Sequence, residues 1–297
     1  MNNYYELKIS INPEIEEIVA DICFSNFDCE GVVLAEEAWK DLEMTATTRG
    51  ILKVFLTNLA PNTIEILKTE RENLKSRGFS DEELGSWEII IDEKQNQDWS
   101  KKWKEKWTVT HVSSKISVVP SWLEYTPKPE EITITLDPGC AFGTGTHQTT
   151  QLCMKAMEKY LKKDDSMADV GTGSGILAIC AKKLGASTVY GCDNDDTVID
   201  VCIQNANINN IDNIKFELNT ADKLKEKYDF ICANILHNIL AEIMGDLKNI
   251  MKPNAKMVLS GILDDKKDVV IKAIERENLR LVESLSQDQW VAFVVEN

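Results

Sequence analysis

Two glycine-rich runs lie close together in the middle of the chain, and they constrain its fold more than any other feature. The first, LDPGCAFGTGTHQTT, spans residues 136–150, and the second, DVGTGSGILA, spans residues 169–178. The second run follows a short apolar stretch and leads into a helical pattern, which predicts a strand, a glycine turn and a helix start. That succession is typical of α/β proteins that bind a nucleoside-containing ligand at the edge of a parallel sheet.

The pattern around these runs predicts a mainly parallel sheet over residues 113–297. Apolar strand-like segments alternate there with helical ones, which is typical of a sheet with helices on both faces. The last two strand-like segments, LRLVESLS and WVAFVVE, are separated only by QDQ. Because a parallel crossover needs about a dozen residues, we expect these two strands to form an antiparallel hairpin at the sheet edge.

The first 93 residues predict a separate, smaller unit. Strand-like and helical segments follow one another there in the order β-α-β-β-α-β, which is the order of the ferredoxin-like split unit. Between the units, residues 94–112 contain NQDWSKKWKEKW, in which Trp99, Trp103 and Trp107 recur every four residues. This spacing predicts a linker helix with the tryptophans on one side, and a basic helix for a membrane surface or a partner is the alternative.

Composition argues against several classes of function. Lys and Arg number 33 and Asp and Glu number 49, and the resulting net charge of −16 opposes direct nucleic-acid binding. No apolar run reaches the roughly 18 residues of a membrane span. The 8 cysteines contain no C-x-x-C pair, and only 3 histidines are present. We therefore expect no metal site and buried, reduced thiols, in a monomeric cytoplasmic protein.

Residues at three predicted strand ends carry groups suited to a nucleoside ligand. Gly171 and Gly173 allow a tight turn and the close approach of a ligand to the backbone, although a turn without a ligand is the alternative. Asp193, which ends TVYGCD, is placed to accept hydrogen bonds from two ribose hydroxyls or, alternatively, to cap a helix. Asn234 and the Ile235 carbonyl can hold a substrate nitrogen, unless Asn234 caps the following helix.

Together these motifs resemble class I S-adenosylmethionine-dependent methyltransferases, and one branch of them in particular. The runs LDPGCAFGTGTHQTT, DVGTGSGILAICAKKLGA and ANIL are similar to the bacterial methyltransferases of large-subunit ribosomal protein eleven. The N-terminal split unit and the QDWSKKWKEKW connector also match, so the resemblance covers nearly the whole chain. It implies an α/β fold with a seven-stranded Rossmann-like methyltransferase domain preceded by a small α+β ferredoxin-like domain.

The resemblance also implies roles for individual residues. Contacts to S-adenosylmethionine fall on Thr150, Gly171, Asp193 and Asn234, with Gly173 as the second glycine of the same loop. The N-terminal domain would bind the ribosomal-protein substrate, and methyl groups would pass to its lysine side chains or its N-terminal amine. We interpret Asn234 as the catalytic residue that positions this amine, and we name no general base.

The first glycine run is interpreted as a second wall of the same pocket. Its residues would fold over the methyl donor, with Phe142 as an apolar cover and Thr150 as a polar contact where the next helix begins. The glycines would provide the sharp turns and the mobility that a closing loop needs. A purely structural irregular loop is the alternative.

Three positions depart from the pattern of this branch, and other functions stay open. Thr172, Gln148 and His237 stand where relatives usually have cysteine, proline and a small residue, and His237 bears on the substrate range. A methyltransferase of another protein lysine or of a small amine is the first alternative. An NAD-dependent oxidoreductase is disfavoured by Ile176, which stands where pyrophosphate-binding loops need a small residue. A non-catalytic ribosome-assembly protein that kept the nucleoside pocket is the third.

Overall fold

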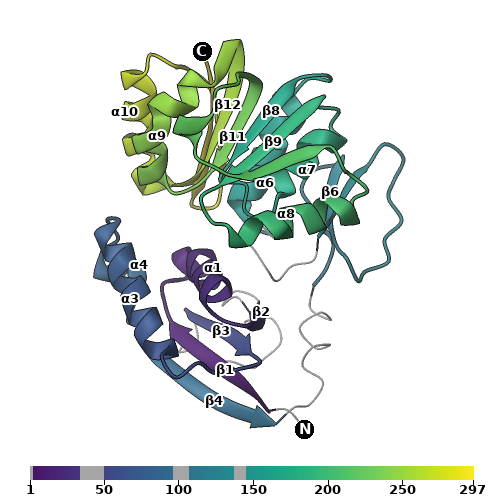
Figure 1. The fold of residues 1–297 in the computed structure, drawn as a ribbon. Coiled ribbons are helices and arrows are strands. Elements are labelled where there is room, and N and C mark those ends of the chain that lie inside the picture. The colour runs from purple at the N-terminus through teal and green to yellow at the C-terminus, as the bar shows by residue number, and fades with distance from the viewer. Residues whose placement is uncertain (1–2, 34–49, 96–106, 137–144) are drawn as a thin grey trace. The chain divides into compact units, whose positions relative to one another are not determined.

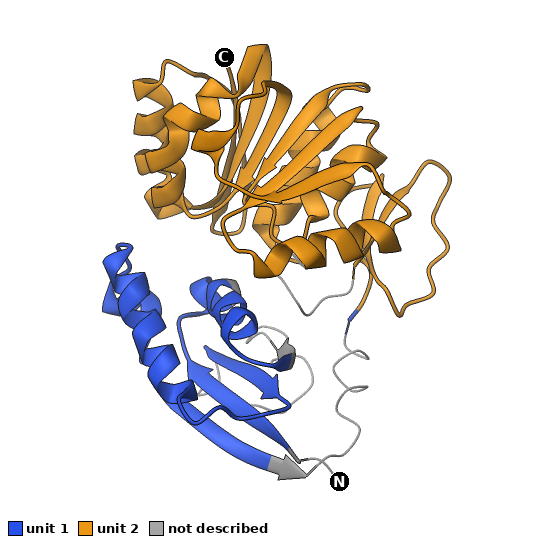
Figure 2. Ribbon diagram, in the orientation of Figure 1, with its two compact units in different colours: residues 1–107, 139–142 blue, residues 108–138, 143–297 orange. Residues whose placement is uncertain are grey.

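The computed structural model of the 297-residue chain describes residues 3–33, 50–95, 107–136 and 145–297. The chain divides into two compact units, which are residues 1–107 with 139–142 and residues 108–138 with 143–297 (Figure 2). Most of the predicted linker helix falls on residues 96–106, which lie outside the described residues. The predicted domain boundaries at residues 93 and 113 therefore stay predictions.

The N-terminal unit contains a four-stranded antiparallel sheet (Figure 1). Its strands are β1 (Asn3–Ser10), β2 (Cys29–Val33), β3 (Ile51–Leu56) and β4 (Ile89–Gln95), in the order β2-β3-β1-β4. Its helices are α1 (Glu16–Asn26), α3 (Thr63–Ser76) and the short α4 (Asp81–Leu84). The predicted alternation is visible in β1, where Leu7 and Ile9 are fully buried. The element order and the strand order confirm the ferredoxin-like arrangement.

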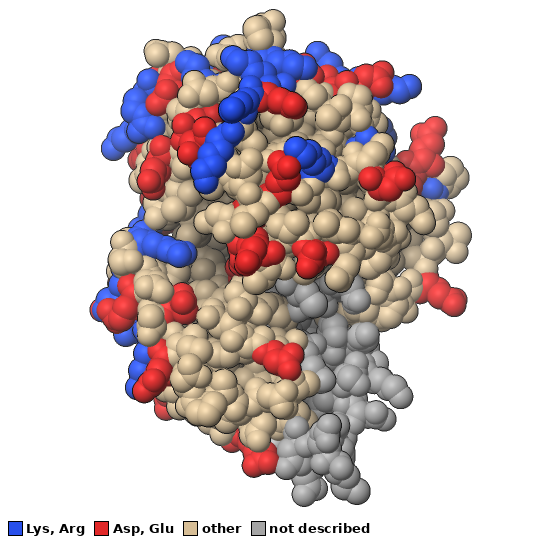
Figure 3. All heavy atoms as spheres, in the orientation of Figure 1, with Lys and Arg blue, Asp and Glu red and all other residues tan. Residues whose placement is uncertain are grey.

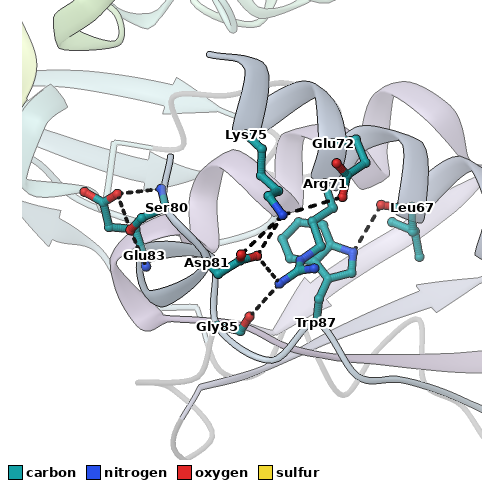
Figure 4. A network of polar contacts seen from close by, with 9 residues as sticks. All are labelled: Leu67, Arg71, Glu72, Lys75, Ser80, Asp81, Glu83, Gly85 and Trp87. Atoms are coloured by element: carbon teal, nitrogen blue, oxygen red, sulfur yellow. Dashed lines mark hydrogen bonds and ion pairs between the residues drawn. The ribbon is translucent and has the colours of Figure 1, made fainter. Parts of the chain in front are cut away.

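Trp87, just before β4, is hydrogen-bonded to the backbone of helix α3. The Trp87 side chain is buried, and its indole N–H donates a hydrogen bond of 3.1 Å to the carbonyl oxygen of Leu67 in the middle of α3 (Figure 4). Nearby, the guanidinium of Arg71 donates to Oδ1 of Asp81 at 2.9 Å, and the Lys75 ammonium lies 3.1 Å from the same oxygen. These contacts connect α3 to the segment that leads through α4 into β4.

The C-terminal unit is built around a seven-stranded sheet with the order β10-β9-β8-β11-β12-β14-β13 (Figure 1). Its strands are β8 (Ser166–Val170), β9 (Thr188–Asp193), β10 (Ile214–Leu218), β11 (Tyr228–Asn234), β12 (Met251–Leu263), β13 (Arg280–Gln287) and β14 (Trp290–Glu296). Neighbours from β10 to β12 pair in parallel, whereas β14 is antiparallel to both β12 and β13. The predicted parallel sheet and its terminal antiparallel hairpin are both confirmed.

Helices cover both faces of this sheet. They are α6 (Gln148–Tyr160), α7 (Ile176–Lys183), α8 (Thr197–Ile208), α9 (His237–Asn249) and α10 (Lys267–Arg276). In the central strand β11, Ile231 packs into a cluster with residues of α9 and α10, while Cys232 packs into another with residues of α6 and α7. Successive strand residues point to opposite faces, so the sheet separates two apolar cores.

A small three-stranded sheet precedes the large one in the chain. It consists of β5 (Thr110–His111), β6 (Ile116–Pro120) and β7 (Ile132–Leu136). β6 and β7 pair in parallel. β7 ends where the first glycine run begins, so this sheet determines where that run starts.

The described cysteines are free thiols, as predicted. Cys29 is partly buried, and the fully buried ones are Cys23, Cys153, Cys180, Cys192, Cys202 and Cys232. Cys140 lies outside the described residues. Within the described part of the chain, His, Cys, Asp and Glu side chains form no group suited to a metal ion. None of the described helices has the length and apolar character needed to cross a membrane.

We expect Trp87→Phe to loosen α3 without unfolding the unit, because it keeps an apolar ring and removes one hydrogen bond. A buried hydrogen bond contributes about 1 kcal/mol, so the exchange protection of α3 amides should fall about fivefold. Native-state hydrogen exchange measures this. Ile64→Val is the control on the same helix, because Ile64 is 42% exposed, and it should leave protection unchanged. Equal protection of the α3 amides in Trp87→Phe and the wild type would show that this hydrogen bond does not stabilise α3.

Candidate functional site

The glycine turn after β8 lies at the point where the order of the large sheet reverses. β8 is flanked by β9 on one side and β11 on the other. Gly171 and Gly173 have φ values of 75° and 51°, in the left-handed region that favours glycine. Asp193 and Asn234 are the last residues of β9 and β11, and parallel strands end at the same edge of a sheet. The structure therefore brings these four predicted residues to one edge.

Asp193 is held against the glycine turn. Its Oδ2 accepts a hydrogen bond of 3.0 Å from the backbone N–H of Gly173, and its Oδ1 accepts one of 3.2 Å from the N–H of Asp195. Burial raises the pKa of Asp193, and the backbone N–H groups oppose this rise. Oδ1 of Asp195, by contrast, accepts from the N–H of Thr197 at 2.9 Å, so Asp195 binds the first turn of α8. The side chain that binds the start of α8 is therefore that of Asp195 and not that of Asp193, while the cap position itself is Asp196.

Helix α8 braces the same turn, which the sequence analysis did not predict. Asn205 is buried and donates from Nδ2 to the carbonyl oxygen of Ser174 at 2.9 Å. The Cys202 thiol lies 2.9 Å from the carbonyl oxygen of Gly173 and donates to it. These bonds occupy two carbonyl groups of the turn and hold its position relative to α8. In the sequence, these contacts could have been suspected only from Cys202 and Asn205, which stand on the inner side of an amphipathic helix.

A second carboxyl group lies beneath the turn, and it was also missed. Asp169 is fully buried, and its Oδ2 accepts from the Thr172 hydroxyl at 2.8 Å and from the N–H of Ala178 at 3.2 Å. Its Oδ1 is buried without a hydrogen-bond partner. Burial raises the pKa of Asp169 to about 7 against the effect of these two donors, and the neighbouring Asp193 charge adds to the rise. The sequence did show an acid, Asp169, directly before the glycine turn, and this could have indicated its role.

Helix α6 brings Thr150 to Asn234. Thr150 is fully buried in the first turn of α6, and its Oγ1 accepts from Nδ2 of Asn234 at 3.4 Å. Asn234 is 7% exposed, and its Oδ1 is buried without a hydrogen-bond partner. Helix α9 begins at His237 with Leu236 at the cap position and no side-chain cap bond. Asn234 is therefore not a helix cap, and its side-chain oxygen is available to another group.

The start of α6 is itself capped by a histidine. Nδ1 of His147 accepts from the N–H of Thr149 at 3.3 Å, and the ring meets Trp290 edge-on with centroids 4.8 Å apart. Burial lowers the pKa of His147 to about 4, so the ring is neutral near pH 7 and can accept this bond. His147 thus supports the turn that carries Thr150, a role that sequence reasoning missed.

The interpretation of the first glycine run as a closing loop falls mainly on residues 137–144, including Phe142, which lie outside the described residues. The described chain resumes at Gly145, which has φ 82°. A Cβ at Gly145 would lie 2.8 Å from side-chain atoms of both Ile176 and Val118. A side chain there would have to displace these two side chains, and the positive φ also favours glycine. The closing-loop role stays a prediction.

The residues at this edge fit S-adenosylmethionine better than a dinucleotide. The ligand carries ribose hydroxyls and an ammonium group, which are donors, and the buried oxygens of Asp169 and Asn234 are acceptors without hydrogen-bond partners. Ile176, at the position where a pyrophosphate-binding loop needs a small residue, is buried at the start of α7.

The sequence matches the family described as "Ribosomal protein L11 methyltransferase (PrmA)" over residues 3–297. A relative named ribosomal protein L11 methyltransferase, from Alkaliphilus oremlandii, is 35% identical over 277 residues, with 92% of this chain and 87% of the relative covered. Another of that name, from Desulforapulum autotrophicum, is 40% identical over 290 residues, with 95% and 93% covered. The crystal structure of ribosomal protein L11 methylase from Lactobacillus delbrueckii subsp. bulgaricus matches with TM-score 0.61 at 34% identity, covering 64% of this chain and 98% of that one.

These matches confirm the resemblance that the motifs indicated. The family match extends from β1 to the end of the chain, so it includes both compact units. The seven-stranded sheet and its reversal point are those expected for a methyltransferase of this type. The chain belongs to the ribosomal protein L11 methyltransferase family, whose methyl donor is S-adenosylmethionine.

Proposed function

We propose that this protein methylates amino groups of ribosomal protein L11, on lysine side chains or on the N-terminal amine. Family membership supports the donor and the class of reaction, and the names of the relatives support the substrate. One structural observation carries the proposal. The Asn234 side-chain oxygen is buried without a hydrogen-bond partner at the strand end next to the glycine turn, where a substrate nitrogen would be held.

The donor would lie along the edge formed by the ends of β8, β9 and β11. In this proposal Gly171 and Gly173 leave room for it against the backbone, and Asp193 accepts hydrogen bonds from its ribose hydroxyls. Thr150 and Asn234 contact it from the side of α6 and β11. When bound, S-adenosylmethionine supplies a methyl group that its sulfonium has already activated. The chain therefore needs to bind, orient and exclude water more than to move protons.

The acceptor amine must be neutral before it can react. A lysine amine has an unperturbed pKa of about 10.4, and burial beside a positive charge lowers that value. The side-chain oxygen of Asn234 and the carbonyl oxygen of Ile235 would then accept hydrogen bonds from the N–H groups of the neutral amine. Asn234 acts in this account as the catalytic positioning group, and no side chain is assigned as a general base.

Charge supports a basic protein substrate. The net charge of −16 favours association with a basic protein such as a ribosomal protein and opposes direct binding to nucleic acid. On the face of the C-terminal unit seen in Figure 3, Lys and Arg side chains are interspersed with Asp and Glu.

We assign substrate recognition to the N-terminal unit. We also propose that the protein acts as a monomer in the cytoplasm, where its thiols stay reduced.

Transfer from labelled S-adenosylmethionine to unmodified ribosomal protein L11 tests this function. Wild-type protein should label L11, which mass spectrometry would identify. Asn234→Ala should lower kcat/KM about 100-fold, because the amine loses one of its two positioning acceptors. Asn207→Ala, at an exposed position of α8, is the matched control and should label L11 as the wild type does. Donor binding without any labelling of L11 by the wild type would contradict the substrate, and full activity of Asn234→Ala would contradict its role.

Donor affinity should rise with pH through neutrality. Burial holds the pKa of Asp169 at about 7 in the free protein, so the carboxyl is partly protonated there. A cationic donor favours the ionised form, so binding should tighten about fivefold from about pH 6 to about pH 8.

Isothermal titration calorimetry with S-adenosylmethionine measures this dependence. Asp169→Asn removes the titrating carboxyl and should flatten the pH profile of the affinity. Asp193 and the ionisable groups of the donor are present in both experiments, so they cannot account for a difference between the two proteins. The same pH dependence in Asp169→Asn and the wild type would show that Asp169 does not sense the donor.

A further inference from the structure

The pairing of strand β12 with β14 is irregular at Ser260 and Gly261, next to the end of β11. Its pairing with β14 shifts register between Leu259 and Ile262, which places a bulge-like irregularity at the two residues between them. Gly261 has φ 84°, a conformation that L side chains rarely adopt. Irregularities of this kind occur next to active sites, where they redirect the groups beside them. Two groups lie against this irregularity.

The first group is the backbone of Ile235. Its N–H donates a hydrogen bond of 3.2 Å to the carbonyl oxygen of Ser260. A Cβ at Gly261 would lie 2.9 Å from the carbonyl carbon of Ile235 and still closer to its oxygen. Any side chain at Gly261 would therefore displace the Ile235 carbonyl.

Ile235 is also confined from the opposite strand. A Cβ at Gly171, in the turn after β8, would overlap Cγ2 of Ile235. β8 and β12 lie on either side of β11 in the sheet. Two glycines with positive φ therefore confine different parts of Ile235: Gly171 lies against its side chain, and Gly261 lies against its carbonyl.

The second group is the first turn of α6. Ser260 is fully buried, and its hydroxyl donates to the carbonyl oxygen of Thr149 at 3.1 Å. The next residue, Thr150, accepts the 3.4 Å hydrogen bond from Nδ2 of Asn234. Ser260 thus connects β12 to the helix turn that orients the Asn234 amide. Ser260 and Gly261 together contact the backbone of Ile235 and the helix turn that orients the Asn234 amide.

We propose that Ser260 and Gly261 are positioning residues that aim the Ile235 carbonyl and the Asn234 amide oxygen at the acceptor amine. This inference rests on the proposed role of those two oxygens. A neutral primary amine has two N–H groups and one lone pair, so two fixed acceptors can hold the N–H groups and leave the lone pair free for the methyl group. A displacement of about 1 Å at such a site costs about 100-fold in rate.

Two variants with matched controls test the inference. Gly261→Ala displaces the Ile235 carbonyl, and Ser260→Ala removes the hydroxyl that binds Thr149. In Gly245→Ala the new Cβ would meet the Glu277 carboxyl group at an ordinary 3.7 Å, and Ser284→Ala changes an exposed residue. For each protein, kcat and KM are measured with ribosomal protein L11, the Kd is measured with S-adenosylhomocysteine, and thermal unfolding is recorded.

We expect kcat to fall about 100-fold in Gly261→Ala and about tenfold in Ser260→Ala, with the Kd within about threefold of the wild type. Both controls should keep the wild-type kcat. Unchanged kcat in folded Gly261→Ala, or a loss explained wholly by donor affinity, would overturn the inference. If Gly261→Ala does not fold, the kcat of Ser260→Ala decides by the same criterion.

The same measurements separate the proposed function from the positioning role of Ser260 and Gly261. If the wild type does not methylate L11, the proposed function falls and the inference falls with it. If the wild type is active and both variants keep its kcat, only the positioning role of Ser260 and Gly261 is overturned.

Discussion

The close packing of Ile235 against two glycines is the constraint on which the rest of this site depends. Ile235 follows the end of β11, between β8 and β12 in the sheet, and it leaves no room for a side chain at Gly171, which lies against its side chain, or at Gly261, which lies against its carbonyl. This packing determines where the Ile235 carbonyl and the Asn234 side chain lie. A glycine with positive φ at each position is the simplest way to satisfy it.

The charges around the turn follow from its burial. Two carboxyl groups lie at or under the turn, and burial raises the pKa of each. Such a site favours a cationic ligand such as a sulfonium donor. The neutral His147 performs a different task at the start of α6, where it caps the helix that brings Thr150 to Asn234. Few groups are required to transfer protons, consistent with a reaction that depends on alignment.

Local sequence patterns predicted a large part of the fold and of the site. The order of elements in both units follows from the alternation of apolar residues, and QDQ was too short for anything but a hairpin turn. Gly171, Gly173, Asp193 and Asn234 were identifiable because each stands at a predicted strand end, and such ends meet at one edge of a parallel sheet.

The remaining site residues could not be predicted, since their roles come from contacts between distant parts of the chain. Ser260 binds Thr149, 111 residues earlier, and Asn205 binds Ser174, 31 residues earlier. Gly261 was one glycine in an apolar strand until its distance to Ile235 was known. The periodicity of apolar residues along a sequence does not indicate contacts between residues so far apart. The linker helix and the closing loop fall on residues that the structure does not describe, so the sequence is still their only support.

The most direct test of this account is a crystal structure of the protein with S-adenosylhomocysteine bound. We predict the ribose hydroxyls on the Asp193 carboxylate, the backbone of Gly171 and Gly173 against the ligand, and the thioether sulfur facing Asn234 and the Ile235 carbonyl. A ligand bound away from these strand ends, or one whose sulfur is turned away from Asn234, would contradict the claim that this edge of the sheet is the methyl-transfer site.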